Sequence, residues 1–280
     1  MFESLKFQYL GPWQQGFDDK SERLCRIGGV IRPVRFRMLP IAVAIVCKTP
    51  QPGASKTRLS PPLTFAQCAQ LSAAFIRDVA QSMNEVAAAS NYAIYTPVGS
   101  EKDLVPLLPD GFRTMPQIDG DLGVRLIRMT RELFIAGHRG VVLVNADSPT
   151  LPHSILRDAI AMTGHTDNVV IAPADDGGYT LIGISQPHDA LFTDIAWSTS
   201  AVYEQTRARA LQLRLPVVEL PLWYDVDDAR YLALLERELA GSPPPFAAKG
   251  LVGAPAPHTR QCLAAFAAMR STHAPVNVTR

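Results

Sequence analysis

The chain has 280 residues, of which 47% are hydrophobic and 19% charged, a composition typical of a globular protein with enough apolar mass for a sizeable core. Its net charge of +1 is unevenly spread: residues 39–240 carry 16 basic and 22 acidic side chains, an acidic balance that disfavours nucleic-acid binding. The sequence holds no apolar run of the ~20 residues that a membrane span needs, and four scattered cysteines without metal-ligand spacing suit a reduced, cytoplasmic protein that does not associate with membranes.

The predicted elements begin after an N-terminal extension, residues 1–38, which has no apolar period and which we expect to be poorly ordered. In residues 39–240, short apolar runs alternate with segments of helical period. The predicted strands cover residues 41–47, 92–95, 141–145, 169–174, 179–184 and 215–220. The predicted helices cover residues 64–89, 102–108, 121–136, 155–162, 201–211 and 226–239. A Pro- and Ala-rich tail, residues 241–280, follows; we expect it to be mobile, with one short helix at 261–269.

Apolar strands that alternate with helices predict an α/β fold, in which a single domain has a mostly parallel sheet with helices on both faces. Ligands of such sheets bind at the carboxyl ends of the strands, so the loops after the strands are where chemistry is expected. Several other enzyme classes lack their signatures here. The chain has no GxGxxG after a strand, no GxSxG elbow and no HExxH spacing among its six histidines.

The loop after the first predicted strand, residues 48–58, combines three cations with a glycine. Backbone amides near a helix N-terminus, together with Lys and Arg side chains, suit a polyphosphate. The spacing is not that of a P-loop, because Ser55 and Pro50 stand where that motif needs glycine. The alternative is a solvated basic turn. The residues expected to bind the phosphates of a nucleotide are Lys48, Gly53, Lys56, Thr57 and Arg58.

Three aspartates are candidate metal ligands. Asp147 follows the predicted strand 141–145, where a cation that bridges donor phosphates would lie. Asp225 and Asp227 alternate in an extended segment, so their side chains can share a face. Because hard cations prefer carboxylate oxygens, we predict that Asp147, Asp225 and Asp227 hold Mg²⁺ or Mn²⁺. The alternatives are that Asp147 caps the turn after its strand and that Asp227 is only the N-cap of the last helix.

Two further loops have both a functional and a structural interpretation. Asp121 opens a predicted helix and is either its N-cap or a substrate contact, in which case it is a candidate catalytic base. Asp176 is a second candidate base. Gly177 and Gly178 let the backbone come close to a ligand, or they form an ordinary tight turn. Trp197 is expected to pack rather than to stack on a ligand.

These motifs, in this order, resemble a family of bacterial glycosyltransferase-like proteins of the GT-A fold, often labelled radical-SAM- or selenodomain-associated transferases. The matching stretches are KTPQPGASKTRL (48–59), GDLGVRL (120–126), NADSPTLP (145–152), PADDGGYTLIGI (173–184), WST (197–199) and DVDDARYL (225–232). The first and last stretches are also similar to phospholactate guanylyltransferase, and molybdenum-cofactor nucleotidyltransferases share the fold more distantly. The resemblance covers nearly all of residues 39–240 and neither extension.

The resemblance implies that Lys56 and Arg58 grip the donor phosphates during catalysis and that Asp147 and Asp225 hold the metal. The chain departs from the family at residues 145–146, Asn-Ala, where the family tends to have glycine and a small polar residue. Asp147 is therefore the only carboxylate at that strand end, which gives Asp225 and Asp227 more weight as ligands.

We predict a transferase that moves a sugar from a nucleotide sugar to a small-molecule acceptor. The first alternative is nucleotidyl transfer, in which an NTP joins a phosphorylated small molecule and pyrophosphate leaves. The order of these two rests on the family resemblance. The second alternative is a non-catalytic nucleotide-binding protein, and the clustered aspartates speak against it, since without a cation they would repel one another. The sequence does not specify an oligomeric state.

Overall fold

The computed structural model describes residues 22–27, 30–35, 40–86, 90–164 and 166–272. The chain divides into two compact units, Met1–Leu39 and Pro40–Arg280. In the first unit, β1 (Glu22–Ile27) pairs antiparallel with β2 (Val30–Arg35). These two strands differ from the expectation, which gave residues 1–38 no strand or helix; the rest of that extension lies outside the described residues.

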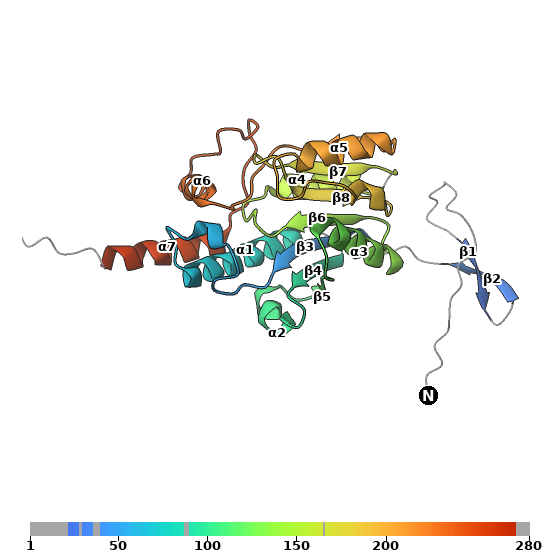
Figure 1. The fold of residues 1–280 in the computed structure, drawn as a ribbon, viewed down its shortest axis with the longest axis horizontal. Helices are drawn as coiled ribbons and strands as arrows, with labels where there is room; N and C mark the ends of the chain where they lie inside the picture. Colours follow the sequence, from blue (N-terminus) through green and yellow to red (C-terminus); the bar gives the residue numbers. More distant parts are fainter. Residues whose placement is uncertain (1–21, 28–29, 36–39, 87–89, 165, 273–280) are drawn as a thin grey trace, which may run out of the picture. The chain divides into compact units, whose positions relative to one another are not determined.

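The second unit is built on a seven-stranded sheet with the order β5-β4-β3-β6-β8-β7-β9 (Figure 1). Only β8 runs antiparallel to its neighbours, β6 and β7, and the other pairs are parallel. The prediction of a mostly parallel sheet is thus confirmed. The strands of this sheet are β3 (Ala42–Lys48), β4 (Ser90–Thr96), β5 (Arg113–Pro116), β6 (Val141–Asn145), β7 (Val169–Pro173), β8 (Tyr179–Ile184) and β9 (Val217–Glu219).

Helices cover both faces of the sheet, as predicted. Successive residues of a strand point to opposite faces. Val43 and Ile45 of β3 therefore pack toward α1, α4, α6 and α7, whereas Ala42 and Ala44 pack toward α3 and α5. None of the described helices is both long and apolar enough to cross a membrane. The helices are α1 (Phe65–Val86), α2 (Glu101–Leu104), α3 (Leu122–Ile135), α4 (His153–Met162), α5 (Val202–Gln212), α6 (Ala229–Leu239) and α7 (Pro257–Thr272), with 3-10 turns η1 (Thr57–Leu59), η2 (Val105–Leu107) and η3 (Asp189–Phe192).

Two elements between β4 and α3 differ from the prediction. The single helix expected at 102–108 is a short α2 followed by the 3-10 turn η2, because Pro106 has no backbone N–H to continue an α-helix. The edge strand β5 was not predicted. Its four residues are all at least partly exposed and include a proline, so they lack the apolar run by which the other strands were recognised.

The segment after residue 240 also differs from the expected mobile tail. Helix α7 packs along α1, with Phe266 buried in the core that α1 also lines (Figure 1). Its first backbone N–H groups are capped from outside: Asp78 of α1 accepts hydrogen bonds from the N–H of His258 at 3.0 Å and of Thr259 at 2.8 Å. The packed domain therefore extends beyond residue 240, to residue 272.

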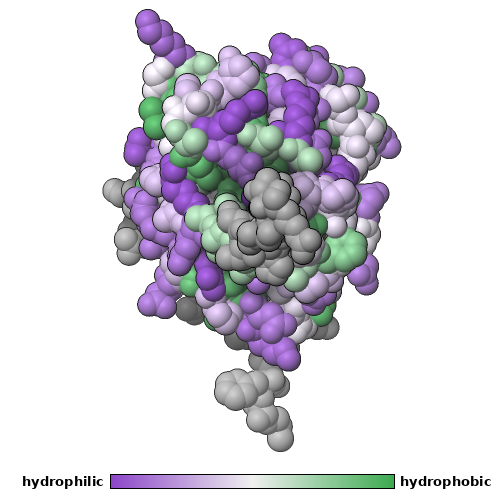
Figure 2. Space-filling model, turned by 90° about the vertical axis from the view of Figure 1, so that its left-hand side faces the viewer, coloured by the Kyte–Doolittle hydropathy of each residue, from purple (hydrophilic) through white to green (hydrophobic). Residues whose placement is uncertain are grey.

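The side of the domain where α6 and α7 lie in Figure 1 faces the viewer in Figure 2. In its visible part, hydrophilic and apolar residues are intermingled over the surface.

Candidate active site

A pocket of about 580 Å³ opens at the carboxyl ends of β3, β4 and β6, the edge at which ligands of parallel sheets bind. It brings together side chains from the loop after β3, from α1, from the start of α3 and from the segment before α6. The lining residues are Val46, Cys47, Lys48, Ala54, Ser55, Lys56, Thr57, Arg58, Ser72, Ile76, Thr96, Gln117, Leu122, Arg125, Ala146, Asp147 and Asp227.

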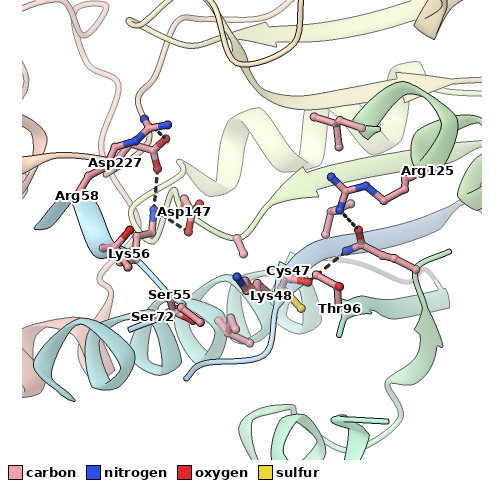
Figure 3. A pocket seen from close by; sticks show the side chains of 17 residues that line it. Cys47, Lys48, Ser55, Lys56, Arg58, Ser72, Thr96, Arg125, Asp147 and Asp227 are labelled. Atoms are coloured by element: carbon pink, nitrogen blue, oxygen red, sulfur yellow. Dashed lines mark hydrogen bonds and ion pairs between the residues drawn. The ribbon is translucent and has the colours of Figure 1, made fainter. Parts of the chain in front are cut away.

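Lys56 lies between two of the predicted metal ligands (Figure 3). Its Nζ is 2.8 Å from Oδ1 of Asp147 and 2.8 Å from Oδ1 of Asp227, and it donates a hydrogen bond of 2.7 Å to the carbonyl oxygen of Val226. The lysine side chain is only 6% exposed. Burial lowers the pKa of Lys56, but attraction to the two carboxylates outweighs burial and raises it, so the ammonium stays charged.

The local backbone explains how Lys56 reaches these partners. Lys56 has a left-handed conformation, with φ 51° and ψ 37°, which is uncommon for a residue other than glycine and tends to occur at functional sites. The loop before it is closed by Ser55, whose N–H donates to the carbonyl oxygen of Gln51 and whose Oγ accepts from the N–H of Gln51. Gly53 supplies a positive φ of 75° in the same loop and is not among the lining residues.

The end of β6 and the segment before α6 hold each other in place. Asn145 donates from Nδ2 to Oδ2 of Asp225 at 3.2 Å and accepts the N–H of Asp147 at 2.9 Å. The N–H of Val226 in turn donates to the carbonyl oxygen of Asp147 at 2.9 Å. Asp225 is buried beside the pocket. Asn145, where the chain departs from the family pattern, thus has a structural role: its side-chain amide connects Asp147 and Asp225, the two aspartates that the resemblance assigns to the metal.

A buried network below this segment fixes it further. Glu238 of α6 accepts hydrogen bonds from the hydroxyls of Thr150, at 2.8 Å, and of Tyr224. The indole of Trp223 donates to Oγ1 of Thr150 at 3.3 Å. Burial raises the pKa of Glu238. Because Trp223 and Tyr224 are fully buried, Asp225 and Asp227 extend from an anchored backbone rather than from a free loop.

The donor chemistry of the three predicted ligands fits a hard divalent cation. Oδ1 of Asp225 is buried and has no hydrogen-bond partner among the described residues. Burial, followed by the charges of Asp176, Asp227 and Asp147, raises the pKa of Asp225 to about 7. Among the described residues, no three His, Cys, Asp or Glu side chains are already grouped to hold a metal, and the Lys56 ammonium lies between Asp147 and Asp227. The assignment of a metal to these three aspartates stays a prediction.

Arg125 lies on the opposite side of the pocket from Lys56 (Figure 3). Gln117 also lines the pocket, and the sequence analysis singled out neither residue. Gln117 is almost fully buried and donates from Nε2 to the carbonyl oxygens of Cys47, at 3.2 Å, and Ile94, at 3.1 Å. Its Oε1 accepts a hydrogen bond of 2.8 Å from Nη1 of Arg125. Gln117 thereby orients the arginine toward the pocket. A polar residue directly after a strand was the available signal, but β5 itself had not been predicted.

Other predicted site residues lie elsewhere. Asp121 is the N-cap of α3, with its side chain accepting the N–H of Val124 at 2.9 Å, and it is not among the lining residues. Gly177 has a φ of 91°, and a Cβ there would stand 2.2 Å from the carbonyl oxygen of Ser200. Its close approach is thus to protein backbone, and Gly177 and Gly178 form the tight turn between β7 and β8 rather than part of the pocket. Trp197 packs, as expected, against the apolar cluster on the face of the sheet that α3 and α5 cover.

Comparisons with known proteins agree with this fold. Residues 79–199 match the model of a family described as "Uncharacterized protein conserved in bacteria (DUF2064)". The chain is 28% identical to a protein of solved structure from Desulfovibrio desulfuricans G20, proposed to be a nucleotide-diphospho-sugar transferase; the match covers 84% of this chain and 99% of that one, with a TM-score of 0.71. The fold is of the GT-A type. No curated protein matches the chain.

Two further solved structures are similar to the chain at lower sequence identity. A nucleotidyl transferase from Methanothermobacter thermautotroptrophicus is 12% identical, with 71% of this chain and 97% of that one covered and a TM-score of 0.49. A CMP:2-keto-3-deoxy-manno-octonic acid synthetase complexed with CTP is 10% identical, with 71% and 100% covered and a TM-score of 0.47. Both TM-scores are below 0.5, so these two structures do not bear on function.

Proposed function

We propose that the chain is a metal-dependent transferase that moves a sugar from a nucleotide sugar to a small acceptor. The observation that carries the proposal is the convergence, at one pocket, of the cationic loop after β3 with Asp147 and Asp227, and with Asp225 buried beside them. The 28% identity to a protein proposed to be a nucleotide-diphospho-sugar transferase supports sugar transfer as the first candidate.

In this proposal the cations of the pocket receive the donor phosphates. Lys48, Arg58 and Arg125 line the pocket from two sides, and Gln117 orients Arg125. When a nucleoside diphosphate leaves, negative charge builds on its phosphates, and cations already in place stabilise that charge. A divalent cation held by the three aspartates would neutralise part of the same charge.

The acceptor hydroxyl needs a group that takes its proton as it attacks. Both candidate bases accept a backbone N–H, Asp121 from Val124 and Asp176 from Gly178, and neither lines the pocket. Asp176 is close enough to Asp225 to raise the pKa of that carboxyl, so it belongs to the same cluster of charges. We therefore keep Asp176 as the candidate base.

Nucleotidyl transfer is the second candidate. One observation favours it: with Lys48, Lys56, Arg58 and Arg125, the pocket contains four cationic side chains, a number that suits the tail of a triphosphate. The two reactions break different bonds. Sugar transfer breaks the bond between the sugar carbon and the phosphate oxygen, whereas nucleotidyl transfer breaks a bond at the α-phosphorus and releases pyrophosphate.

A thermal-shift screen of the purified chain tests the proposal. The protein is heated with Mg²⁺ or Mn²⁺ in the presence of each common NTP and each common nucleotide sugar. A ligand that binds only the folded state raises the melting temperature, by an amount that grows with its concentration relative to its dissociation constant. We expect a metal-dependent shift with at least one nucleotide sugar.

The outcomes separate the candidates. A shift with an NTP alone, followed by pyrophosphate release on addition of phosphorylated acceptors, would replace sugar transfer by nucleotidyl transfer. No shift with any nucleotide, at concentrations up to several millimolar, would overturn the assignment of this pocket to a nucleotide.

A further inference from the structure

The Lys56 ammonium fills a cation site made of oxygen atoms. Three oxygens, from Asp147, Asp227 and the backbone carbonyl of Val226, lie 2.7–2.8 Å from Nζ, one for each of its three N–H donors. The ammonium is therefore fully satisfied without water, in keeping with its 6% exposure. Carboxylate and carbonyl oxygens are also the ligands that Mg²⁺ and Mn²⁺ take in proteins.

From this coincidence, and building on the proposed function, we propose that Lys56 is an internal counterion that competes with the divalent metal for Asp147 and Asp227. When the metal binds, the lysine is released from the aspartates and turns to the phosphates of the donor. Lys56 then has two positions: on the carboxylates in the free protein and on the nucleotide in the complex.

Charge balance favours such an exchange. Asp147, Asp225 and Asp227 bring three carboxyl groups together, and Lys56 is the one cation within 3 Å of any of them in the described part of the chain. Arg58 does not replace it, since its Nη1 is 3.8 Å from Asp227 and the side chain is 71% exposed. A divalent ion neutralises more of this charge than the ammonium does, and the released ammonium finds new acceptors on the phosphates.

The geometry of the loop makes the movement short. Lys56 is itself a lining residue of the pocket that contains Lys48 and Arg125. Its Cα is held by the closed loop of residues 51–55, so only the four-carbon stem has to turn. The exchange requires no rearrangement of the sheet.

The proposal predicts that metal and nucleotide favour each other's binding. The metal has to displace the lysine, and a phosphate group offers the lysine a new partner, so each ligand lowers the cost of binding the other. By linkage, the factor by which the nucleotide strengthens metal binding equals the factor by which the metal strengthens nucleotide binding.

Mn²⁺ binding without nucleotide tests this directly, with free Mn²⁺ counted by electron paramagnetic resonance. We expect Lys56→Met, which keeps most of the stem and removes the charge, to bind Mn²⁺ at least about tenfold more tightly than the unmodified chain. Arg157→Met is the control: it removes one positive charge from an exposed position of α4 that does not line the pocket, and its affinity should change by less than about threefold.

A second pair of measurements locates the ion. In the Lys56→Met background, Asp147→Asn should abolish the gain in Mn²⁺ affinity. With the nucleotide that the thermal-shift screen identifies, the unmodified chain should bind Mn²⁺ more tightly than without it, and Lys56→Met should lose most of this coupling. Melting curves in the absence of metal establish that each variant is folded, and Lys56→Gln replaces Lys56→Met if the latter does not fold.

The exchange is overturned if Lys56→Met binds Mn²⁺ no more tightly than the unmodified chain, or if the gain survives Asp147→Asn. Failure of the proposed function would be seen in a different measurement, the thermal-shift screen. In that case the unmodified chain shows no nucleotide-dependent thermal shift, whatever the Mn²⁺ affinity of Lys56→Met.

Discussion

Two regions of the domain supply aspartates with donors in opposite ways. Around the pocket, Asp147 and Asp227 share the ammonium of Lys56, a side-chain partner on a flexible stem. Between α1 and α7, Asp78 is 2% exposed and accepts hydrogen bonds from two backbone N–H groups at the start of α7. Asp78 has lost its water, whereas Asp147 and Asp227 stay 34% and 39% exposed, and in both places the carboxylates have found donors.

The difference lies in whether the partner can leave. The N–H groups that donate to Asp78 belong to α7 and cannot move away without unfolding the first turn of that helix. Asp78 therefore stabilises the fold. The ammonium of Lys56 can move while the backbone stays in place, so the carboxylates it covers remain available to another cation. Burial of a charge therefore identifies a functional site only when its partners are considered as well.

The largest effect is expected for Asp147→Ala, which should lower turnover about 10³-fold, as the loss of several kcal/mol of charge stabilisation implies. Because the side chain is 34% exposed, the melting temperature should stay within about 3 °C of the unmodified chain. Turnover is measured with the donor that the thermal-shift screen identifies. Asp158→Ala, at an exposed position of α4, is the matched control and should keep full activity. Turnover within tenfold of the unmodified chain would remove Asp147 from the site.

Asp78→Ala should have the largest effect on stability, a loss of about 3 kcal/mol, because two buried backbone N–H groups lose their acceptor. In a domain of this size that corresponds to a fall of roughly 6–12 °C in melting temperature. Urea unfolding measures the loss, and nucleotide affinity well below the transition should not change. A loss below about 0.5 kcal/mol would show that α7 does not depend on this cap.

Gly177→Ala should cost about 2 kcal/mol, since alanine is strained at a φ of 91° and its Cβ would stand 2.2 Å from the carbonyl oxygen of Ser200. Gly53→Ala is the control for the backbone term alone. It also has a positive φ, 75°, but nothing lies within 4 Å of the added Cβ, so the expected cost is about 1 kcal/mol. Equal losses in the two variants would contradict the close approach at Gly177.

Gln117→Leu should weaken nucleotide binding about tenfold, because Arg125 loses the acceptor that orients it. Calorimetry measures the affinity, and a double-mutant cycle with Arg125→Ala supplies the control. If Gln117 acts through Arg125, the double variant should bind about as weakly as Arg125→Ala alone. Additive losses would show that the glutamine affects the pocket in some other way, for example through the strand ends that it connects.

Much of the fold could be read from local pattern. The strands β6 and β8 were predicted with the bounds that the structure has, because the apolar run of β6 leads straight into a turn and β8 follows a pair of glycines. The strand β5 was missed because a four-residue edge strand lacks such a run, and α7 was underestimated because its anchor, Asp78, belongs to another helix.

The site residues also fall into those that the sequence predicted and those that it did not. Lys48, Lys56, Thr57, Arg58, Asp147 and Asp227 were expected at a pocket, and all six line it. Gly177 was open to two interpretations, since the sequence shows that a close approach is allowed but not what approaches. Gln117 and Arg125 could not be found, because their importance depends on a hydrogen bond between residues of separate elements.

The sequence by itself determined most strands and helices along the chain, since apolar runs and helical periods are patterns among neighbouring residues. Their alternation in turn predicted the mostly parallel sheet and the edge at which charged loops gather. Only the tertiary structure decided which charges meet. Lys56 and Asp227 are 171 positions apart, and their contact exists because the sheet brings the loop after β3 beside the end of β6 and the segment before α6. That pairing places an ammonium ion where a metal was expected.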